Sequence, residues 1–192
     1  MKIGSLTPIV LLSLMLGLSG CTTVANVTNS DTIEENYGKR TIGARVEDES
    51  IETKIEVNLS KTDARFDDAR VNVDSYNGIV LLTGQVPSEE LQEKALDIAE
   101  DVRNVRKVHN ELSVSANLPA GQRISDGWLS TRIRTALATN ENIDASRIRV
   151  ITENASVYLM GIVTREEGDR IAKAASGING VQRIVKAFEY LD

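Results

Sequence analysis

One arrangement of residues occurs twice along this chain, and the duplication limits the folds that the chain can adopt more than any other feature. The matching segments are residues 48–59 with 126–137, residues 80–86 with 157–163, and Val105 and Val108 with Val181 and Ile184. The offset between the copies is 78 at the first match, 77 at the second and 76 at the last. Two single-residue gaps over such a length indicate a duplication, so we expect two copies of one small domain.

The first helix of each copy is predicted from apolar residues that recur every four positions and so share one helix face. These residues are Ile51, Ile55 and Leu59 in the first copy and Leu129, Ile133 and Leu137 in the second. A short carboxylate can accept the free N–H groups of a helix's first turn, so Asp48 and Asp126 are the expected N-caps.

Two strands joined by a tight turn are predicted to follow the helix. Alternating apolar residues lie on both sides of Asn77-Gly78, a pair that favours a two-residue hairpin turn. In the second copy Ala155 takes the place of Gly78, so we expect a turn there that is strained or of another type. Gly84 and Gly161 occupy equal positions in the second strand, where a bulge or a close-packing role is expected.

A second helix and a last strand complete each copy. The helix is predicted over residues 88–103 and 166–178, and the strand over residues 106–114 and 182–191. The fold class is therefore α/β (α+β), with two helices and a small mixed three-stranded sheet in each copy. Each copy has roughly 70 residues, which is near the lower limit for an independent core, so we expect the two copies to pack on each other.

An N-terminal targeting segment precedes the duplication. Lys2, an apolar run and the small residues before Cys21 are typical of a secretory signal. The sequence Leu-Ser-Gly-Cys that ends at Cys21 resembles the bacterial lipobox, in which the cysteine is acylated with palmitate and becomes the first residue. An ordinary signal peptide with a chance cysteine is the alternative. Thr22 replaces the aspartate that retains such lipoproteins at the inner membrane, which by resemblance implies the outer membrane.

Composition divides the chain further. The expected segments are a signal peptide at 1–20, a lipidated N-terminus and flexible tether at 21–46, a first domain at 47–115, a linker at 116–124 and a second domain at 125–192. Residues 22–122 carry 11 basic and 19 acidic side chains, a balance of −8, whereas residues 123–192 carry 10 and 9, a balance of +1. Different partners are therefore expected for the two halves, and the acidic total argues against nucleic acid.

The sequence offers little chemistry for catalysis. His109 is the only histidine, and a structural or surface role is expected for it. Asp63, Asp67 and Asp68 are close together but lack the glycine and the spacing of a calcium loop. We therefore expect no enzyme activity, no metal site, no cofactor and no small-molecule substrate.

Positions where the two copies differ are candidates for function, and Trp128 differs most clearly because its counterpart is Ser50. At ~100° per residue, Trp128 lies about 140° from the centre of the apolar stripe, so it should point away from the core. An outward indole with nearby arginines suits a membrane surface. The predicted phospholipid-binding residues are Trp128, Thr131, Arg132, Arg134 and Thr135. The alternative is that Trp128 packs between the two copies.

The whole pattern resembles the BON-domain family (bacterial OsmY and nodulation). Residues 126–134 and the Val-x-Leu-x-Gly-x-Val strand at 157–163 carry most of the similarity, which covers nearly all of the chain after Cys21. The resemblance implies phospholipid binding and envelope integrity rather than catalysis. It also implies a lipid-anchored protein of the outer membrane that faces the periplasm and gathers at the division site.

Two functional hypotheses follow. In the first, the chain is a non-enzymatic outer-membrane lipoprotein that binds anionic phospholipid through the first helix of its second domain. In the second, it is a periplasmic adaptor whose acidic first domain recruits an envelope-assembly or cell-wall-remodelling protein. The second hypothesis relies on Glu49, Glu52 and Glu56 of the first domain.

Overall fold

A computed structural model describes residues 37–191 of the chain. The predicted signal peptide, Cys21 and most of the predicted tether lie outside these residues. Within the described part, no helix combines the length and the apolar character needed to cross a membrane.

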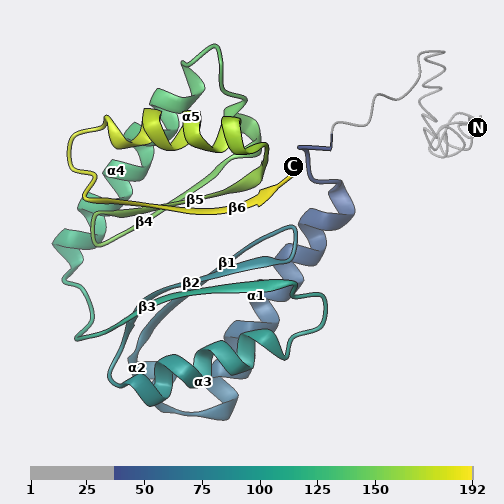
Figure 1. The fold of residues 1–192 in the computed structure, drawn as a ribbon. Coiled ribbons are helices and arrows are strands. Elements are labelled where there is room, and N and C mark those ends of the chain that lie inside the picture. Colours follow the sequence, from purple (N-terminus) through teal and green to yellow (C-terminus); the bar gives the residue numbers. More distant parts are fainter. Residues whose placement is uncertain (1–36, 192) are drawn as a thin grey trace, which may run out of the picture. The chain divides into compact units, whose positions relative to one another are not determined.

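The predicted order of helix, strand, strand, helix and strand is confirmed in both repeats (Figure 1). The first repeat contains α1 (Ile42–Thr62), α2 (Arg65–Asp68), β1 (Arg70–Tyr76), β2 (Ile79–Val86), α3 (Glu89–Glu100) and β3 (Lys107–Val114). The second contains α4 (Ala120–Ala138), the 3-10 helix η1 (Ala145–Arg147), β4 (Arg149–Glu153), β5 (Ser156–Val163), α5 (Arg165–Ser176) and β6 (Arg183–Tyr190). The short α2 and η1 segments were not predicted.

Each repeat forms a mixed three-stranded sheet, which confirms the predicted fold class. The strand orders are β1-β2-β3 and β4-β5-β6. The central strand pairs antiparallel with the strand before it and parallel with the strand after it in both sheets. The parallel pair needs a crossover connection, which α3 and α5 supply.

Both long helices begin earlier than predicted. Thr41 caps α1, because its Oγ1 atom accepts a hydrogen bond of 3.0 Å from the backbone N–H of Ala44. Pro119 precedes α4. Asp48 and Asp126 therefore lie inside their helices, and the prediction that they are N-caps is wrong. The helices also include residues 42–46, predicted as tether, and residues 120–124, predicted as linker.

The two faces of each sheet pack against different partners. Helices α1 and α3 cover one face of the first sheet, and α4 and α5 cover one face of the second (Figure 1). Side chains from the opposite faces of both sheets form a shared apolar cluster of Tyr76, Ile79, Leu81, Tyr158, Met160, Ile162 and Ala187. The repeats thus pack sheet against sheet, which confirms that they pack on each other.

The hairpin turn has the same backbone conformation in both repeats. Asn77 and Gly78 have φ angles of 52° and 75°, and Asn154 and Ala155 have φ angles of 48° and 57°. Both turns therefore place two residues in the left-handed region, as a type I′ turn requires. The expected strain falls on Ala155, because the left-handed region costs an L-residue with a Cβ atom about 1–2 kcal/mol.

Ala155→Gly is expected to raise the free energy of unfolding by about 1 kcal/mol, because glycine relieves the left-handed strain and loses only part of that gain to chain entropy. Urea denaturation monitored by circular dichroism measures the change. Gly78→Ala is the opposite control and should destabilise, since its Cβ atom would lie 2.7 Å from the carbonyl oxygen of Asn104. An unchanged or lower midpoint for Ala155→Gly would contradict the strain.

The strand glycines allow a close approach of two backbones. A Cβ atom on Gly84 would lie 1.9 Å from the carbonyl oxygen of Arg70, and one on Gly161 would lie 2.8 Å from that of Arg147. The expected close-packing role is confirmed at both positions. Gly84 therefore lets the start of β1 approach β2, and Gly161 lets the end of η1 approach β5.

Candidate functional site

Trp128 lies on the outer surface of α4. Its side chain is 68% exposed, and Ile124, one helical turn earlier, is 62% exposed. The alternative in which Trp128 packs between the repeats is therefore wrong. Ile124 was missed by the sequence analysis, although its spacing of four residues from Trp128 was a usable signal. Together they form an exposed apolar pair on a helix whose opposite face is core.

The hydroxyl groups beside this pair are already satisfied by the helix. Thr131 Oγ1 donates to the carbonyl oxygen of Gly127 at 3.0 Å, and Thr135 Oγ1 donates to that of Thr131 at 3.0 Å. Ser125 and Thr139 make the same bond to the residue four positions earlier. Because these hydroxyl groups have partners within the helix, moving this face out of water costs less than it would for free hydroxyls.

The charged residues of α4 differ in where they point. Its only carboxylate, Asp126, is buried. Arg132 is exposed beside Trp128 and donates from Nη2 to the carbonyl oxygen of Asn179 at 2.8 Å. Arg134 instead donates from Nη2 to the carbonyl oxygen of Val150 in edge strand β4, at 2.8 Å. Of the five predicted lipid-binding residues, the structure therefore brings four onto one face and places Arg134 on the flank.

We call the exposed surface of α4 formed by Ile124, Trp128, Thr131, Arg132 and Thr135 the Trp128 face. It combines an indole, an isoleucine, threonine methyl groups and one guanidinium, and it has no exposed carboxylate within the helix. A surface of this composition can enter the boundary between lipid headgroups and acyl chains.

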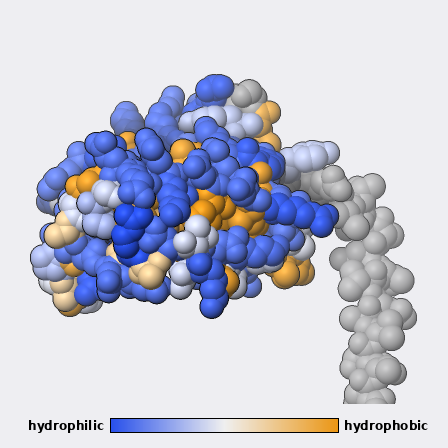
Figure 2. Space-filling view, turned by 90° about the horizontal axis from the view of Figure 1, so that it is seen from below, coloured by the Kyte–Doolittle hydropathy of each residue, from blue (hydrophilic) through white to orange (hydrophobic). Residues whose placement is uncertain are grey.

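The corresponding helix of the first repeat has another character. Val46 and Val57 are 61% and 50% exposed on α1, and the carboxylates of Glu49 and Glu56 are exposed near them. The face of the first repeat that carries α2 and α3 is mostly hydrophilic, with hydrophobic side chains in small patches (Figure 2). The surface of α1 around Glu49 and Glu56 is therefore less suited to an anionic membrane than the Trp128 face.

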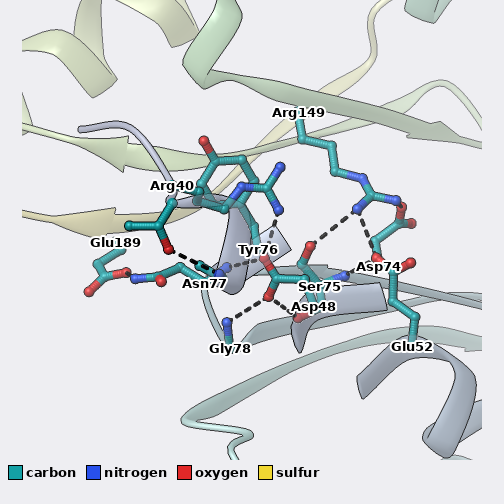
Figure 3. Close-up of polar contacts among 12 residues, drawn as sticks. Arg40, Asp48, Glu52, Asp74, Ser75, Tyr76, Asn77, Gly78, Arg149 and Glu189 are labelled. Atoms are coloured by element: carbon teal, nitrogen blue, oxygen red, sulfur yellow. Dashed lines mark hydrogen bonds and ion pairs between the residues drawn. The ribbon is translucent and has the colours of Figure 1, made fainter. Parts of the chain in front are cut away.

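Glu52, the third acidic residue of the adaptor hypothesis, is engaged within the protein. Its Oε1 atom accepts hydrogen bonds from Arg149 Nη1 at 2.8 Å and from the backbone N–H of Ser75 at 2.7 Å. Arg149 comes from β4 and also contacts Asp74 at 2.6 Å and the Ser75 carbonyl oxygen at 3.1 Å (Figure 3). Glu52 therefore joins the two repeats and does not belong to a free acidic surface.

Glu153 makes a second polar connection between the repeats. It is buried and accepts hydrogen bonds from Gln85 Nε2 at 2.8 Å and from Arg70 Nη1 at 3.1 Å. Burial raises the pKa of Asp74 in the same interface, while Arg149 partly offsets this effect. These contacts could not be found from sequence, because each joins residues more than 65 positions apart.

Asp48 and Asp126 have the same unexpected role in their repeats. Asp48 accepts hydrogen bonds from the backbone N–H groups of Asn77 and Gly78 at 2.8 and 2.9 Å (Figure 3). Asp126 accepts the equivalent bonds from Asn154 and Ala155 at 2.9 and 3.0 Å. Each helix therefore binds the hairpin turn of its own sheet through one buried carboxylate.

The candidate metal ligands and the single histidine can be located within residues 37–191. No group of three histidine, cysteine or acidic side chains in this part of the chain could hold a metal ion. His109 lies on β3 and its Nε2 atom is buried without a hydrogen-bond partner within the described structure. Burial, together with Lys107, lowers the pKa of His109. This environment fits the structural role expected for it.

Two α-β-β-α-β domains packed sheet against sheet, with an exposed tryptophan on one helix, define a tandem-repeat protein of the α+β class. The BON domain matches residues 47–116 and 125–192. These two segments include most of the chain, so the chain belongs to the BON-domain family, in agreement with the resemblance seen in its sequence.

Curated relatives extend this likeness to the whole chain. The chain is 37% identical to the outer membrane lipoprotein DolP of Haemophilus influenzae, over 98% of this chain and 100% of the relative. It is 35% identical to a 21 kDa hemolysin of Actinobacillus pleuropneumoniae, over 79% of this chain and 78% of the relative. It is 25% identical to osmotically-inducible protein Y of Escherichia coli, over 82% and 84%. The similarity to DolP supports an outer-membrane lipoprotein of the BON-domain family.

Proposed function

We propose that this protein binds anionic phospholipid through the Trp128 face of α4 and thereby supports the integrity of the cell envelope, without catalysing a reaction. The observation that carries the proposal is the exposure of Trp128 and Ile124, 68% and 62%, on a helix that has no exposed carboxylate. An exposed apolar pair on one helix face, without a carboxylate beside it, is a candidate contact surface.

Physical chemistry favours a lipid headgroup region as that partner. The indole ring gains from apolar contact while its N–H group stays hydrated, which is the environment at the headgroup boundary. Arg132 adds attraction to an anionic leaflet, worth about 1 kcal/mol for each nearby cation. Its planar guanidinium also matches the geometry of a phosphate group.

A lipid on Cys21 would hold the protein at the same membrane. Residues 22–36, between Cys21 and the described domain, can span at most roughly 50 Å when fully extended. Once the lipid anchors the protein, α4 is held near the membrane at a high effective concentration. A modest intrinsic affinity of α4 for lipid is then sufficient. In this arrangement the protein faces the periplasm, and lipid preference would enrich it at the division site.

The test uses the fact that Trp128 is the only tryptophan. The protein used is residues 21–192 carrying Cys21→Ser, called the Cys21→Ser chain, which has neither the apolar N-terminal segment nor a lipid. It is mixed with vesicles of phosphatidylglycerol or of phosphatidylcholine, and its fluorescence emission is recorded. We expect a water-like spectrum in buffer that shifts to shorter wavelength with phosphatidylglycerol and much less with phosphatidylcholine. An emission spectrum that neither vesicle changes would overturn the proposal.

The adaptor function is the second candidate, and the exposed Val46 and Val57 beside Glu49 and Glu56 favour it. A partner with apolar and basic side chains would fit this face of α1. An unchanged Trp128 spectrum would leave this function as the better explanation of the chain. Both functions are compatible in one molecule, because they use different helices.

A further inference from the structure

We propose that a pocket between the start of α1 and the η1 segment binds a phosphate-bearing anion. The pocket has a volume of about 410 Å³ and is lined by Lys39, Arg40, Arg45, Tyr76, Ser146 and Arg147. Four of the six lining side chains are cations and none is a carboxylate. These residues come from both repeats and from the segment just before α1.

Contacts between the repeats fix the walls of the pocket. Tyr76 of the first repeat donates its hydroxyl hydrogen to the carbonyl oxygen of Arg147 in the second, at 2.7 Å. Gly38 lies against Arg147 so closely that a Cβ atom there would be 2.1 Å from Nη1. The Arg40 guanidinium stacks on the Tyr76 ring at 3.7 Å from its centroid. The guanidinium groups of Arg40 and Arg147 are therefore held in place before any ligand arrives.

Two of the four cations already have carboxylate partners. Arg40 pairs with Asp48 at 2.7 Å, and Arg147 pairs with Asp144 and Glu167 at 3.2 and 2.8 Å. These acids lie behind the arginines and do not line the pocket.

Lys39 and Arg45 carry the uncompensated charge. Within the described part of the chain, neither has a carboxylate within ion-pair distance. Hydrogen bonds from Ser146 chiefly lower the pKa of Asp144, and the charges of Arg147 and Lys39 contribute less. Lys39 is thus near this acid without forming an ion pair with it.

A phosphate group fits this lining better than other small anions. Guanidinium groups donate pairs of parallel N–H bonds to phosphate oxygens, and an ammonium adds a compact point charge. The Ser146 hydroxyl also lines the pocket, but it donates its hydrogen to Asp144 Oδ1 at 2.6 Å, so the cations carry the binding of the anion. A headgroup phosphodiester and a free phosphate share this chemistry, and both are small enough for the pocket. The site shares no residue with the Trp128 face and does not depend on the lipid-binding proposal.

The experiment follows backbone amide resonances of the Cys21→Ser chain by NMR during titration with inorganic phosphate or with glycerophosphoglycerol, at constant ionic strength set with chloride. We expect saturable shifts at residues 39–46 and 146–147. Lys39→Ala combined with Arg45→Ala should weaken binding at least tenfold. Lys61→Ala combined with Lys173→Ala removes two exposed cations elsewhere and should leave the affinity unchanged.

The two ligands distinguish the sources of the phosphate. Binding of glycerophosphoglycerol supports a lipid headgroup, whereas binding of inorganic phosphate alone supports a free phosphate. The proposed site would be overturned if chloride alone caused the same amide shifts. It would also be overturned if the Lys61/Lys173 double variant lost as much affinity for phosphate as the Lys39/Arg45 double variant. The amide and indole resonances of Trp128, which lies outside the pocket, report whether each variant is folded. Ligand-induced shifts at Trp128 without shifts at residues 39–46 and 146–147 would contradict the proposed site.

Discussion

Asp48→Ala is expected to lower the free energy of unfolding by about 3 kcal/mol at pH 7, because the buried carboxylate is the common acceptor for the first hairpin turn. Besides the two turn N–H groups, it accepts a bond from Ser75 Oγ at 2.7 Å and one from Arg40 Nη1 at 2.7 Å. Alanine would leave the buried hydroxyl of Ser75 and the N–H of Gly78 without an acceptor. Guanidinium denaturation followed by circular dichroism measures the loss.

The effect should depend on pH with a definite sign. Burial raises the pKa of Asp48, but hydrogen bonds from Gly78, Ser75, Arg40 and Asn77 outweigh it and hold the pKa below the ordinary value of 3.8. A carboxylate with a depressed folded pKa stabilises fully above its unfolded pKa, and this stabilisation is lost as pH falls through the folded pKa. The destabilisation by Asp48→Ala should therefore be larger at pH 7 than at pH 2.

Two further variants separate charge from packing. Asp48→Asn keeps the shape and one acceptor oxygen, so it should cost less than alanine and show a weaker pH dependence. Asp126→Ala should cost about 2 kcal/mol. This carboxylate accepts from Gln122 at 3.1 Å in addition to the turn, and it has no arginine partner among residues 37–191. Equal losses for Asp48→Ala and Asp126→Ala would contradict a role for Arg40.

The role of these two aspartates shows where sequence reasoning succeeds and where it fails. The duplication and the apolar spacing correctly predicted both helices, and the Asn-Gly pair correctly predicted the first turn. The N-cap prediction for Asp48 failed because Thr41 begins the helix earlier, through a segment with Gly43 and few core residues. An aspartate near the predicted start of a helix is a reasonable N-cap candidate. Only the fold shows that the hairpin turn lies beside Asp48 and donates its N–H groups to it.

At the candidate site, the residues whose position depends on the helix period were predicted correctly, and those whose position depends on long-range contacts were not. The outward direction of Trp128 follows from the helix period alone, so it was predictable. Glu52 appeared to be one of three equivalent surface acids, yet Arg149, 97 residues away, makes it part of the interface between the repeats. Arg134 likewise binds a β4 carbonyl that a helical projection cannot reveal. Contacts between residues far apart in the sequence set the roles of Glu52 and Arg134, and the spacing of residues along the chain does not predict such contacts.

The second large effect is expected in membrane binding. Trp128→Glu should weaken the affinity of the Cys21→Ser chain for phosphatidylglycerol vesicles by roughly 3 kcal/mol, which is about 100-fold at 25 °C. The substitution removes the apolar contact of the indole and adds a negative charge at an anionic surface. A glutamate four residues before Arg132 would also pair with that guanidinium and reduce its attraction to lipid. Vesicle sedimentation across a range of lipid concentrations measures the affinity.

The duplication provides a matched control for this variant. Ser50→Glu makes the same charge change at the equivalent position of α1, four residues before Lys54. It should leave vesicle affinity within about twofold, because Ser50 belongs neither to the Trp128 face nor to the lining of the cationic pocket. Since Trp128 is 68% exposed, its replacement should not alter the thermal unfolding midpoint. Equal loss of binding in both variants would indicate a general charge effect, and retained binding in Trp128→Glu would remove α4 as the membrane-binding helix.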